Sequence, residues 1–395
     1  MKQEFMVPGF LANGINCGIK EDGRRDLCLI FSTNKAVAAG VFTRNAFKAA
    51  PVILDMEKIK RGVGQAIVVN SGVANAATGE EGLQAARATS AAVSKNLNIP
   101  DDLVYVASTG VIGRPVPVQK IEKAMPELVS GLTETGILSA EEAIMTTDKM
   151  PKLSQAKAVI NGREITICGI AKGAGMIEPN MATMLSFIMT DAVIERDTLD
   201  TVFKRSINKS FNAITVDGCM STNDTALILA NGLAGGNAIQ GARNTGIFSK
   251  MLDQVLSELA YLMVKDGEGA TKVMEFIVEE ARTISEARKI AYAVANSNLV
   301  KTAFYGKDPN WGRIIGAIGT VNERIPVSAV RVDFNETPIF ADGCGVPANE
   351  YKLREIMELA RIQVFIRMGM GKKGFRLLAS DLTHEYVTIN AHYTT

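Results

Sequence analysis

Strand-like and helix-like segments interleave along the whole 395-residue chain, and this pattern restricts the fold more than any other feature. Short apolar runs such as 64–72 and 164–170 predict buried strands. Amphipathic stretches such as 196–211 and 248–267 predict helices that cover them. The strand-like segments often come in pairs, and we expect two strands in 26–43. Because each element must bury its apolar face against another, the sequence predicts a layered, mixed α/β (α+β) fold.

Local signals refine this expectation. Ser139 and Glu142 have the spacing of a capping box, so a helix is expected to begin at Ser139. The segment 285–301 predicts one capped helix, and 183–194 predicts a strand. The sequence contains no internal repeat, low-complexity tract or evident linker.

Composition argues against several classes of protein. The net charge of +1 argues against a nucleic-acid partner or a basic membrane patch. The chain starts without the apolar core of a secretory signal and has no apolar run long enough to span a bilayer. Its five cysteines are odd in number, scattered and without a C-x-x-C motif. We therefore expect a cytoplasmic protein with reduced thiols and no nucleic-acid or membrane partner.

The chain contains only two histidines, His384 and His392. A histidine-rich metal centre is excluded, and a Ser-His-Asp or Cys-His site would have to use one of these two. We therefore expect no bound metal. If the chain is a hydrolase or transferase, its nucleophile is expected to work without histidine.

The stretch KGAGMIEPNMATMLSF, Lys172–Phe187, allows three interpretations. Its G-x-G suggests a phosphate loop, but Glu178 stands where the dinucleotide fingerprint needs glycine, and Pro179 interrupts a following helix. A tight turn between strands is the second interpretation. In the third, the Ala182–Thr183 bond breaks and the new α-amino group, with an ordinary pKa of about 7.7–8.0, serves as the base for the Thr183 hydroxyl. The stretch alone leaves all three open.

Other polar loops have both a chemical and an ordinary explanation. The segment 106–113 ends in Ser-Thr-Gly, which suits the stabilisation of an oxyanion but also an ordinary strand-to-loop turn. Asp266 and Glu268 lie among glycines after a long helix, where carboxylates are usually only solvated. Trp311, the single tryptophan, is either a packing anchor or a pocket wall.

Taken together, these motifs resemble the ornithine acetyltransferase family of arginine biosynthesis, nearly from end to end. The resemblance lies in GFLANGINCGIK (9–20), AAGVFTRNAFKAAPV (38–52), VVNSGVANAATGEEG (68–82), ASTGVIG (107–113), IMTTDKMPK (144–152), KGAGMIEPNMATML (172–185), SFNAITVDGCMSTNDT (210–225), KDGEGATK (265–272), SNLVKTAFYGKDPNWGRI (297–314) and DLTHEYVTINAHYTT (381–395).

The resemblance implies a fold and a maturation step. The fold would be a layered αββα-type sandwich of the self-cleaving N-terminal-nucleophile-like class, with a smaller C-terminal α/β subdomain. Cleavage at Ala182–Thr183 would give an α chain, 1–182, and a β chain, 183–395. Two α and two β chains would form a heterotetramer.

The same resemblance implies roles for individual residues. Thr183 would be the nucleophile, and Thr109 and Gly110 would stabilise the oxyanion. The positions that match substrate contacts are Thr147, Lys172, Thr183, Glu268, Asn390 and Thr395.

The implied reaction moves an acetyl group from N2-acetyl-L-ornithine to L-glutamate through an acetyl-threonine. It needs no cofactor, and acetyl-CoA is a second candidate donor that the sequence neither requires nor excludes. A related self-cleaving aminopeptidase or amidase, which passes the acyl group to water, is the alternative.

Overall fold

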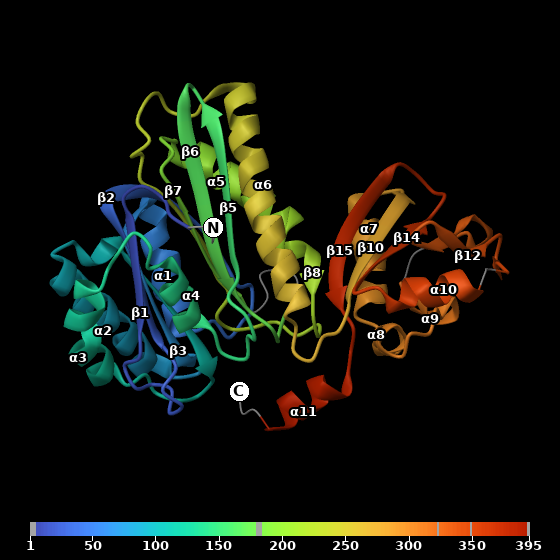
Figure 1. Ribbon diagram of the computed structural model, residues 1–395, viewed down its shortest axis with the longest axis horizontal. Helices are drawn as coiled ribbons and strands as arrows, with labels where there is room; N and C mark the ends of the chain where they lie inside the picture. Colours follow the sequence, from blue (N-terminus) through green and yellow to red (C-terminus); the bar gives the residue numbers. More distant parts are fainter. Residues whose placement is uncertain (1–4, 179–183, 322–323, 348–349, 393–395) are drawn as a thin grey trace.

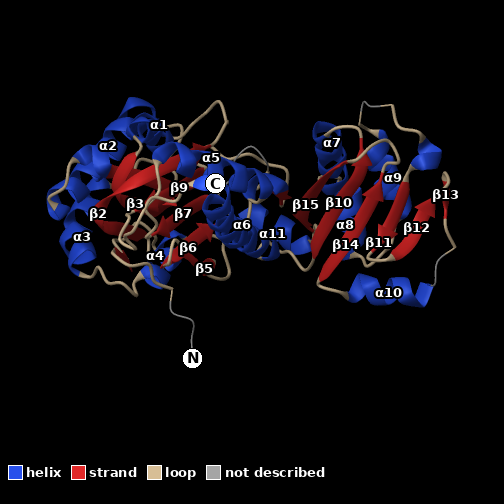
Figure 2. Ribbon diagram, turned by 90° about the horizontal axis from the view of Figure 1, so that it is seen from above, coloured by secondary structure: helices blue, strands red, loops and turns tan. Residues whose placement is uncertain are grey.

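The computed structural model describes residues 5–178, 184–321, 324–347 and 350–392. The first of its two β-sheets has the order β4-β3-β2-β9-β7-β6-β5, and β1 pairs with β2 outside this path (Figures 1 and 2). Its strands are β1 (Phe10–Ile15), β2 (Leu27–Phe42), β3 (Val63–Val73), β4 (Val104–Val111), β5 (Leu153–Ile160), β6 (Arg163–Lys172), β7 (Leu185–Thr190) and β9 (Thr225–Ala230).

The long strand β2 belongs to both halves of this sheet. It pairs with β1 at 27–32, with β3 at 27–31 and again at 36–37, and with β9 at Val37–Phe42. The β2–β3 register shifts between Phe31 and Ala36 but the two strands stay paired on both sides of the shift. The prediction of two strands in 26–43 is therefore wrong: continued ladder bonds keep the chain extended as one strand, which bends at an irregularity.

The two halves of the sheet face each other as separate layers. Ile30 and Ile67 of one half share an apolar cluster with Phe187 and Leu227 of the other. The outer face of the first layer packs against α1 (Ala50–Lys58), α2 (Gly79–Leu97) and α3 (Val118–Ser130). The outer face of the second packs against α5 (Arg196–Lys209) and α6 (Gly241–Lys265). Figure 1 shows the order helix, strand, strand, helix from left to right, which confirms the expected αββα sandwich.

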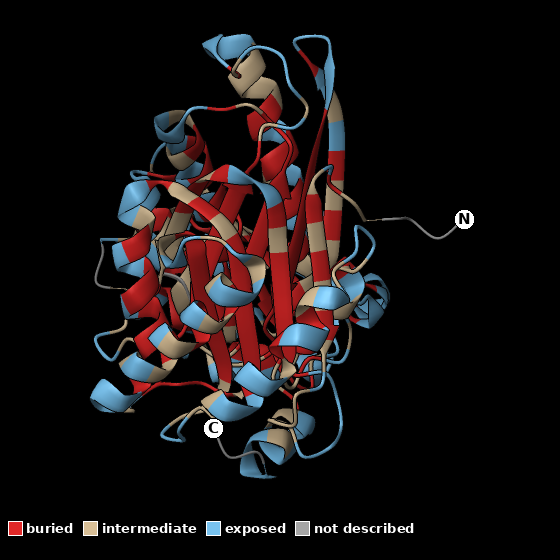
Figure 3. Ribbon diagram, turned by 90° about the vertical axis from the view of Figure 1, so that its left-hand side faces the viewer, coloured by how far each residue is buried: buried red, intermediate tan, exposed pale blue. Residues whose placement is uncertain are grey.

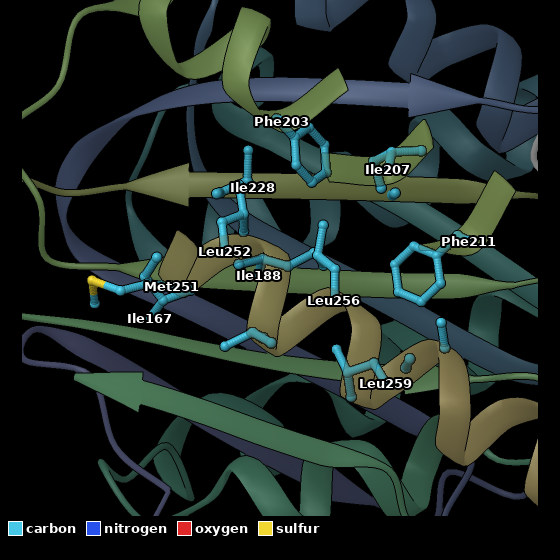
Figure 4. Close-up of a cluster of buried hydrophobic side chains, with 14 of the residues drawn as sticks. Ile167, Ile188, Phe203, Ile207, Phe211, Ile228, Met251, Leu252, Leu256 and Leu259 are labelled. Carbon is cyan, nitrogen blue, oxygen red and sulfur yellow. The ribbon is translucent and has the colours of Figure 1, made fainter. Parts of the chain in front are cut away.

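Helix α6 illustrates why these residues form these elements. Leu252, Leu256 and Leu259 recur at helical spacing, and all three are fully buried. Figure 4 shows them in one apolar cluster with Ile167, Ile188 and Ile228 of the sheet. In Figure 3 the strands of the sandwich are mostly buried, with exposed positions in β2 and β5, while the covering helices expose their outward faces.

A smaller C-terminal subdomain is built on the second sheet, as expected. Its order is β13-β12-β11-β14-β10-β15-β8. The elements are β8 (Ile214–Thr215), β10 (Val273–Ala281), β11 (Arg331–Phe334), β12 (Thr337–Ala341), β13 (Cys344–Gly345), β14 (Arg361–Arg367) and β15 (Lys373–Ser380), which pack with α7 (Ile284–Ala295), α8 (Asn298–Tyr305), α9 (Trp311–Gly319) and α10 (Glu350–Glu358). Because β8 comes from the sandwich part of the chain and pairs with β15, it ties the two sheets together.

Two predicted helix boundaries are wrong. Helix α4 (Ile137–Ile144) begins before Ser139, whose Oγ donates a hydrogen bond to the Gly136 carbonyl at 2.8 Å, so no capping box forms. The segment 285–301 holds parts of two helices, because Ser297 caps α8 by accepting a hydrogen bond from the Val300 N–H. The structure assigns Trp311 a packing role, with its ring centroid 5.3 Å from that of Phe340.

The last described helix, α11 (His384–His392), follows β15 and returns toward the sandwich (Figure 1). None of the helices in the described parts of the chain is long and apolar enough to cross a membrane.

The packing of α6 leads to a stability prediction. Leu256→Ala removes a fully buried side chain between α6 and the sheet, so we expect a loss of about 2–5 kcal/mol in the free energy of unfolding. Leu138→Ala, at a leucine that is 46% exposed, is the control and should lower it much less. The midpoints of urea unfolding measure both, and equal shifts would contradict the prediction.

Candidate active site

Several of the predicted oxyanion and substrate residues lie at one end of the sandwich. There, β3 and β4 of one layer end, β6 of the other layer ends at Lys172, and β7 and β9 begin. Lys172 Nζ lies 2.7 Å from Thr146 Oγ1 and 3.4 Å from Thr109 Oγ1. Lys172 is also the ladder partner of Leu185, two residues after Thr183. The contact between Lys172 and Thr109 therefore joins the two layers beside the segment that contains the predicted nucleophile.

Gly110 occupies a position that only glycine can fill. Its φ is +133°, and a Cβ added there would come within 2.2 Å of the Gly72 carbonyl carbon. The β3–β4 register shifts between Gly72 and Val73, beside Gly110. The close approach of the two backbones explains why the sequence places glycine directly after Thr109.

Lys172 is held by a buried carboxylate that the sequence reasoning missed. Asp148 lies 3.7 Å from Lys172 Nζ through Oδ2, and its Oδ1 accepts hydrogen bonds from the Gly173 N–H and from Lys152 Nζ, both at 2.7 Å. Lys152 is fully buried and also donates to Asp266 Oδ2 at 2.6 Å. Two lysines and two aspartates thus form one buried network behind the site.

The charges of this network depend on one another. Burial lowers the pKa of Lys172 below its ordinary value, although Asp148 opposes the shift. Burial alone would raise the pKa of Asp148, but Lys172 and Lys152 outweigh it and lower that pKa. Likewise Asp148 and Asp266 raise the pKa of Lys152 against the effect of burial. Asp148 and Lys152 therefore remain ionised despite their burial.

Thr147 lies between two residues that contact Lys172. It is half-buried, whereas Thr146 Oγ1 and Asp148 Oδ2 make the contacts. The motif IMTTDKMPK contains all three, so the signal was present in the sequence. Spacing alone could not tell which hydroxyl and which acid reach the lysine, because the segment is an irregular loop.

Glu268 joins the glycine-rich segment to the C-terminal helix. Its N–H donates to the Ala174 carbonyl at 2.8 Å, and its Oε2 accepts a hydrogen bond from Asn390 Nδ2 of α11 at 2.8 Å. A Cβ on Gly175 would lie 2.5 Å from the Glu268 carboxyl carbon, so this glycine makes room for the acid. Glu268 is buried, which corrects the alternative that it is simply solvated at a helix end.

Three predicted residues, Ala182, Thr183 and Thr395, lie outside the described residues. The structure therefore brings together Thr109, Gly110, Thr147 and Lys172 at the ends of the strands, and Glu268 with Asn390 beside the segment that follows Lys172. Within the described ranges, no group of three or more His, Cys, Asp or Glu side chains is placed to hold a metal ion.

The layered fold with polar side chains gathered where its two sheet halves end defines an αββα sandwich protein with a candidate site at that end. Sequence comparison then gives the family: a model of the ArgJ family matches residues 11–395, so the chain belongs to the ArgJ family. The arginine biosynthesis bifunctional protein ArgJ of Geobacter sulfurreducens is 45% identical over 391 residues, covering 98% of this chain and all of that protein.

Two further relatives are similar. The ArgJ bifunctional protein of Thermotoga neapolitana is 46% identical over 400 residues, covering 99% of this chain and all of that protein. A crystal structure of the argJ bifunctional protein of Bacillus halodurans is 41% identical and superposes with a TM-score of 0.43, covering 45% of this chain and 92% of that chain.

The buried network predicts a large effect of Asp148→Asn. Removing the negative charge leaves Lys172 and Lys152 buried with one carboxylate fewer, so we expect a loss of about 3–5 kcal/mol in the free energy of unfolding at pH 7. Glu164→Gln breaks the exposed pair with Lys157 and should cost about 1 kcal/mol at most.

The pH dependence gives a second readout. Because the pKa of Asp148 is lower in the folded protein, its stabilising effect is complete above about pH 4 and is lost as the pH falls further. The difference in urea midpoint between wild type and Asp148→Asn should therefore narrow in acid. A difference that is small at pH 7, or independent of pH, would show that the network does not depend on this charge.

Proposed function

We propose that this protein is a glutamate N-acetyltransferase of arginine biosynthesis, which transfers acetyl from N2-acetyl-L-ornithine to L-glutamate. The observation that carries the proposal is the contact of Thr109 with Lys172 across the two layers, where Lys172 pairs with Leu185, two residues after Thr183 in the sequence. A candidate oxyanion donor and a candidate cation for a substrate carboxylate thus lie together near the start of β7, the strand that follows Thr183 in the sequence. The names of the relatives, bifunctional proteins of arginine biosynthesis, agree with it.

The nucleophile is proposed to arise by self-cleavage. The Thr183 hydroxyl attacks the Ala182 carbonyl carbon, the C–N bond breaks, and the acyl group moves from nitrogen to oxygen. Water then hydrolyses the ester, which leaves a carboxylate on Ala182, a free amine on Thr183 and the hydroxyl restored. The products are an α chain, 1–182, and a β chain, 183–395.

Transfer then follows a ping-pong course. The Thr183 α-amino group takes the hydroxyl proton as Oγ attacks the acetyl carbonyl, so no histidine is needed. Because a lysine ammonium only donates hydrogen bonds, Thr109 Oγ1 accepts from Lys172 and keeps its own hydrogen for the oxyanion, with the Gly110 N–H as the second donor. Ornithine leaves with the proton, and the amine of glutamate attacks the acetyl ester.

The remaining predicted residues are proposed to bind substrate. Donor and acceptor are both amino acids with an α-carboxylate, for which Lys172 offers the charge. Glu268 offers an anion for an amino group. Contacts from the flanking loop and the C-terminus would come from Thr147, Asn390 and Thr395.

The other assignments complete the proposal. The mechanism uses no cofactor, and acetyl-CoA is proposed as a second donor. The mature protein is proposed to be a cytoplasmic heterotetramer of two α and two β chains. An aminopeptidase or amidase would share the self-cleavage and the acyl-threonine but would pass the acyl group to water.

A glutamate acetylation assay with acetylornithine, and separately with acetyl-CoA, tests the activity. N-acetylglutamate formed from acetylornithine supports the transferase. Ornithine and acetate formed without N-acetylglutamate would identify a hydrolase. The acetyl-CoA reaction decides only whether a second donor is used.

Thr183→Ala tests the nucleophile. The variant lacks the attacking hydroxyl, so we expect one intact chain and no transfer, whereas freshly purified wild type gives two bands of about half the chain each on a denaturing gel. Full activity in an uncut wild-type protein would contradict the proposed mechanism.

Thr109→Ala tests the oxyanion donor. Its loss should lower kcat about 10²–10³-fold if the hydroxyl stabilises the transition state. Thr89→Ala is a matched control, because Thr89 is also a buried threonine but bonds to the Ala85 carbonyl within α2. Equal turnover in wild type and Thr109→Ala would remove Thr109 from this role.

A further inference from the structure

The residues on both sides of the proposed cleavage segment are fixed by one loop of the chain. This loop, 215–225, runs from the end of β8 to the start of β9. It contacts Ile177 on the upstream side and Met184 on the downstream side. Both of these residues are almost completely buried.

Upstream, a carboxylate of the loop holds two successive backbone N–H groups. Asp217 accepts hydrogen bonds from Met176 at 2.6 Å and from Ile177 at 2.9 Å. The Ile177 carbonyl accepts in turn from the Val216 N–H at 2.9 Å. Met176 has a φ of +54°, a conformation that costs energy in a residue with a side chain and persists only where the surroundings enforce it.

Asp217 is itself held in place. Its Oδ1 also accepts a hydrogen bond from the Cys219 N–H at 3.1 Å, and its Oδ2 accepts one from the Tyr386 hydroxyl of α11 at 3.2 Å. Each oxygen of this carboxyl group therefore has two donors.

Downstream, a second carboxyl group of the same loop binds the residue that follows Thr183. Asp224 Oδ1 accepts a hydrogen bond from the Met184 N–H at 3.0 Å, and the Met184 carbonyl accepts from the Thr225 N–H at 3.0 Å. Asp224 is fully buried, and its burial raises its pKa well above the ordinary value. A neutral carboxyl oxygen still accepts a hydrogen bond, so the contact does not need a charge.

We propose that Asp217 and Asp224 are positioning residues for self-cleavage, which hold the backbone on either side of the Ala182–Thr183 bond in the geometry that lets the hydroxyl reach the carbonyl. The inference rests on the proposed function. It adds that Asp217 and Asp224 together act as a clamp on the backbone, although the loop that carries them supplies neither the nucleophile nor a substrate contact. Attack within a chain depends steeply on geometry, and a displacement of about 1 Å can cost about 100-fold in rate.

The test follows the disappearance of full-length chain after cell-free synthesis, on denaturing gels. Asp224→Ala removes the acceptor for the Met184 N–H and should slow self-cleavage at least about tenfold. Asp224→Asn keeps an oxygen acceptor at the same place and should restore a rate near that of wild type. The mature, cleaved fraction of each variant is then assayed for transfer.

Asp191→Ala is the matched control. Asp191 is also buried, directly after the end of β7, and accepts a backbone hydrogen bond from the Thr166 N–H at 2.8 Å, at the end of β7 opposite the proposed cleavage segment. Thermal unfolding of each uncut chain, made with Thr183→Ala, measures how much stability each substitution removes. Asp191→Ala should lose stability and still cleave at the wild-type rate.

The outcomes separate the inference from the function on which it rests. Wild-type cleavage with an unchanged rate in Asp224→Ala overturns the clamp but leaves the proposed function intact. Slow cleavage in Asp191→Ala as well would also overturn it, because a general loss of stability would then explain the slow rate. Equally slow cleavage in Asp224→Ala and Asp224→Asn would overturn it too, because loss of the carboxyl proton would then explain the slow rate. A wild-type chain that never cleaves defeats the proposed self-cleavage first. If Asp224→Ala does not fold, Asp217→Ala and Asp217→Asn test the upstream end. Both should slow cleavage, because each carboxylate oxygen of Asp217 accepts two hydrogen bonds and an amide nitrogen accepts none. An unchanged rate in Asp217→Ala overturns the clamp.

Discussion

The hydrogen-bond ladder of β2 is the constraint on which the sandwich depends. One strand pairs with β1, β3 and β9, so both layers belong to one continuous sheet. Their relative position is therefore fixed by backbone bonds as well as by side-chain packing. Strand β4 pairs with β3 on one side of β2, and β6 is linked to β2 through β7 and β9 on the other side. The pairing of β2 therefore determines where the end of β4 with Thr109 meets the end of β6 with Lys172.

The candidate site contains charged side chains whose removal from water costs free energy. A buried lysine is costly unless it is paired, and the gain from pairing about offsets the cost of removing both charges from water. The Asp148–Lys152–Asp266 arrangement meets this requirement with short, shared hydrogen bonds. Such a network adds little net stability compared with apolar packing. It does hold the buried Lys172 ammonium group beside Asp148 and Thr109.

The sequence predicted some features of the fold and site better than others. Strand and helix types followed from apolar periodicity, and Gly110 and Lys172 were found through their motifs. Local reasoning failed at 26–43, where distant strands keep the chain extended, and at 285–301, where Ser297 starts a new helix. It also missed Thr146 and Asp148, because the direction of a loop side chain depends on what packs against it. The catalytic and substrate-binding roles of all the predicted site residues, Thr183 and Thr395 among them, stay predictions.

The sequence by itself determined the types of secondary-structure element and the family. It also showed the scarcity of histidine, which favours a nucleophile whose own α-amino group serves as its base. Each depends on residue types and their order, which are local properties. Only the tertiary structure decided that β4 and β6 meet from opposite layers, and that Asp148 lies under Lys172. It alone showed that Asp217 binds the backbone of Ile177 and Asp224 that of Met184, on either side of the proposed cleavage segment. These contacts join residues more than twenty positions apart, and strand register and burial, which no local pattern encodes, bring them together.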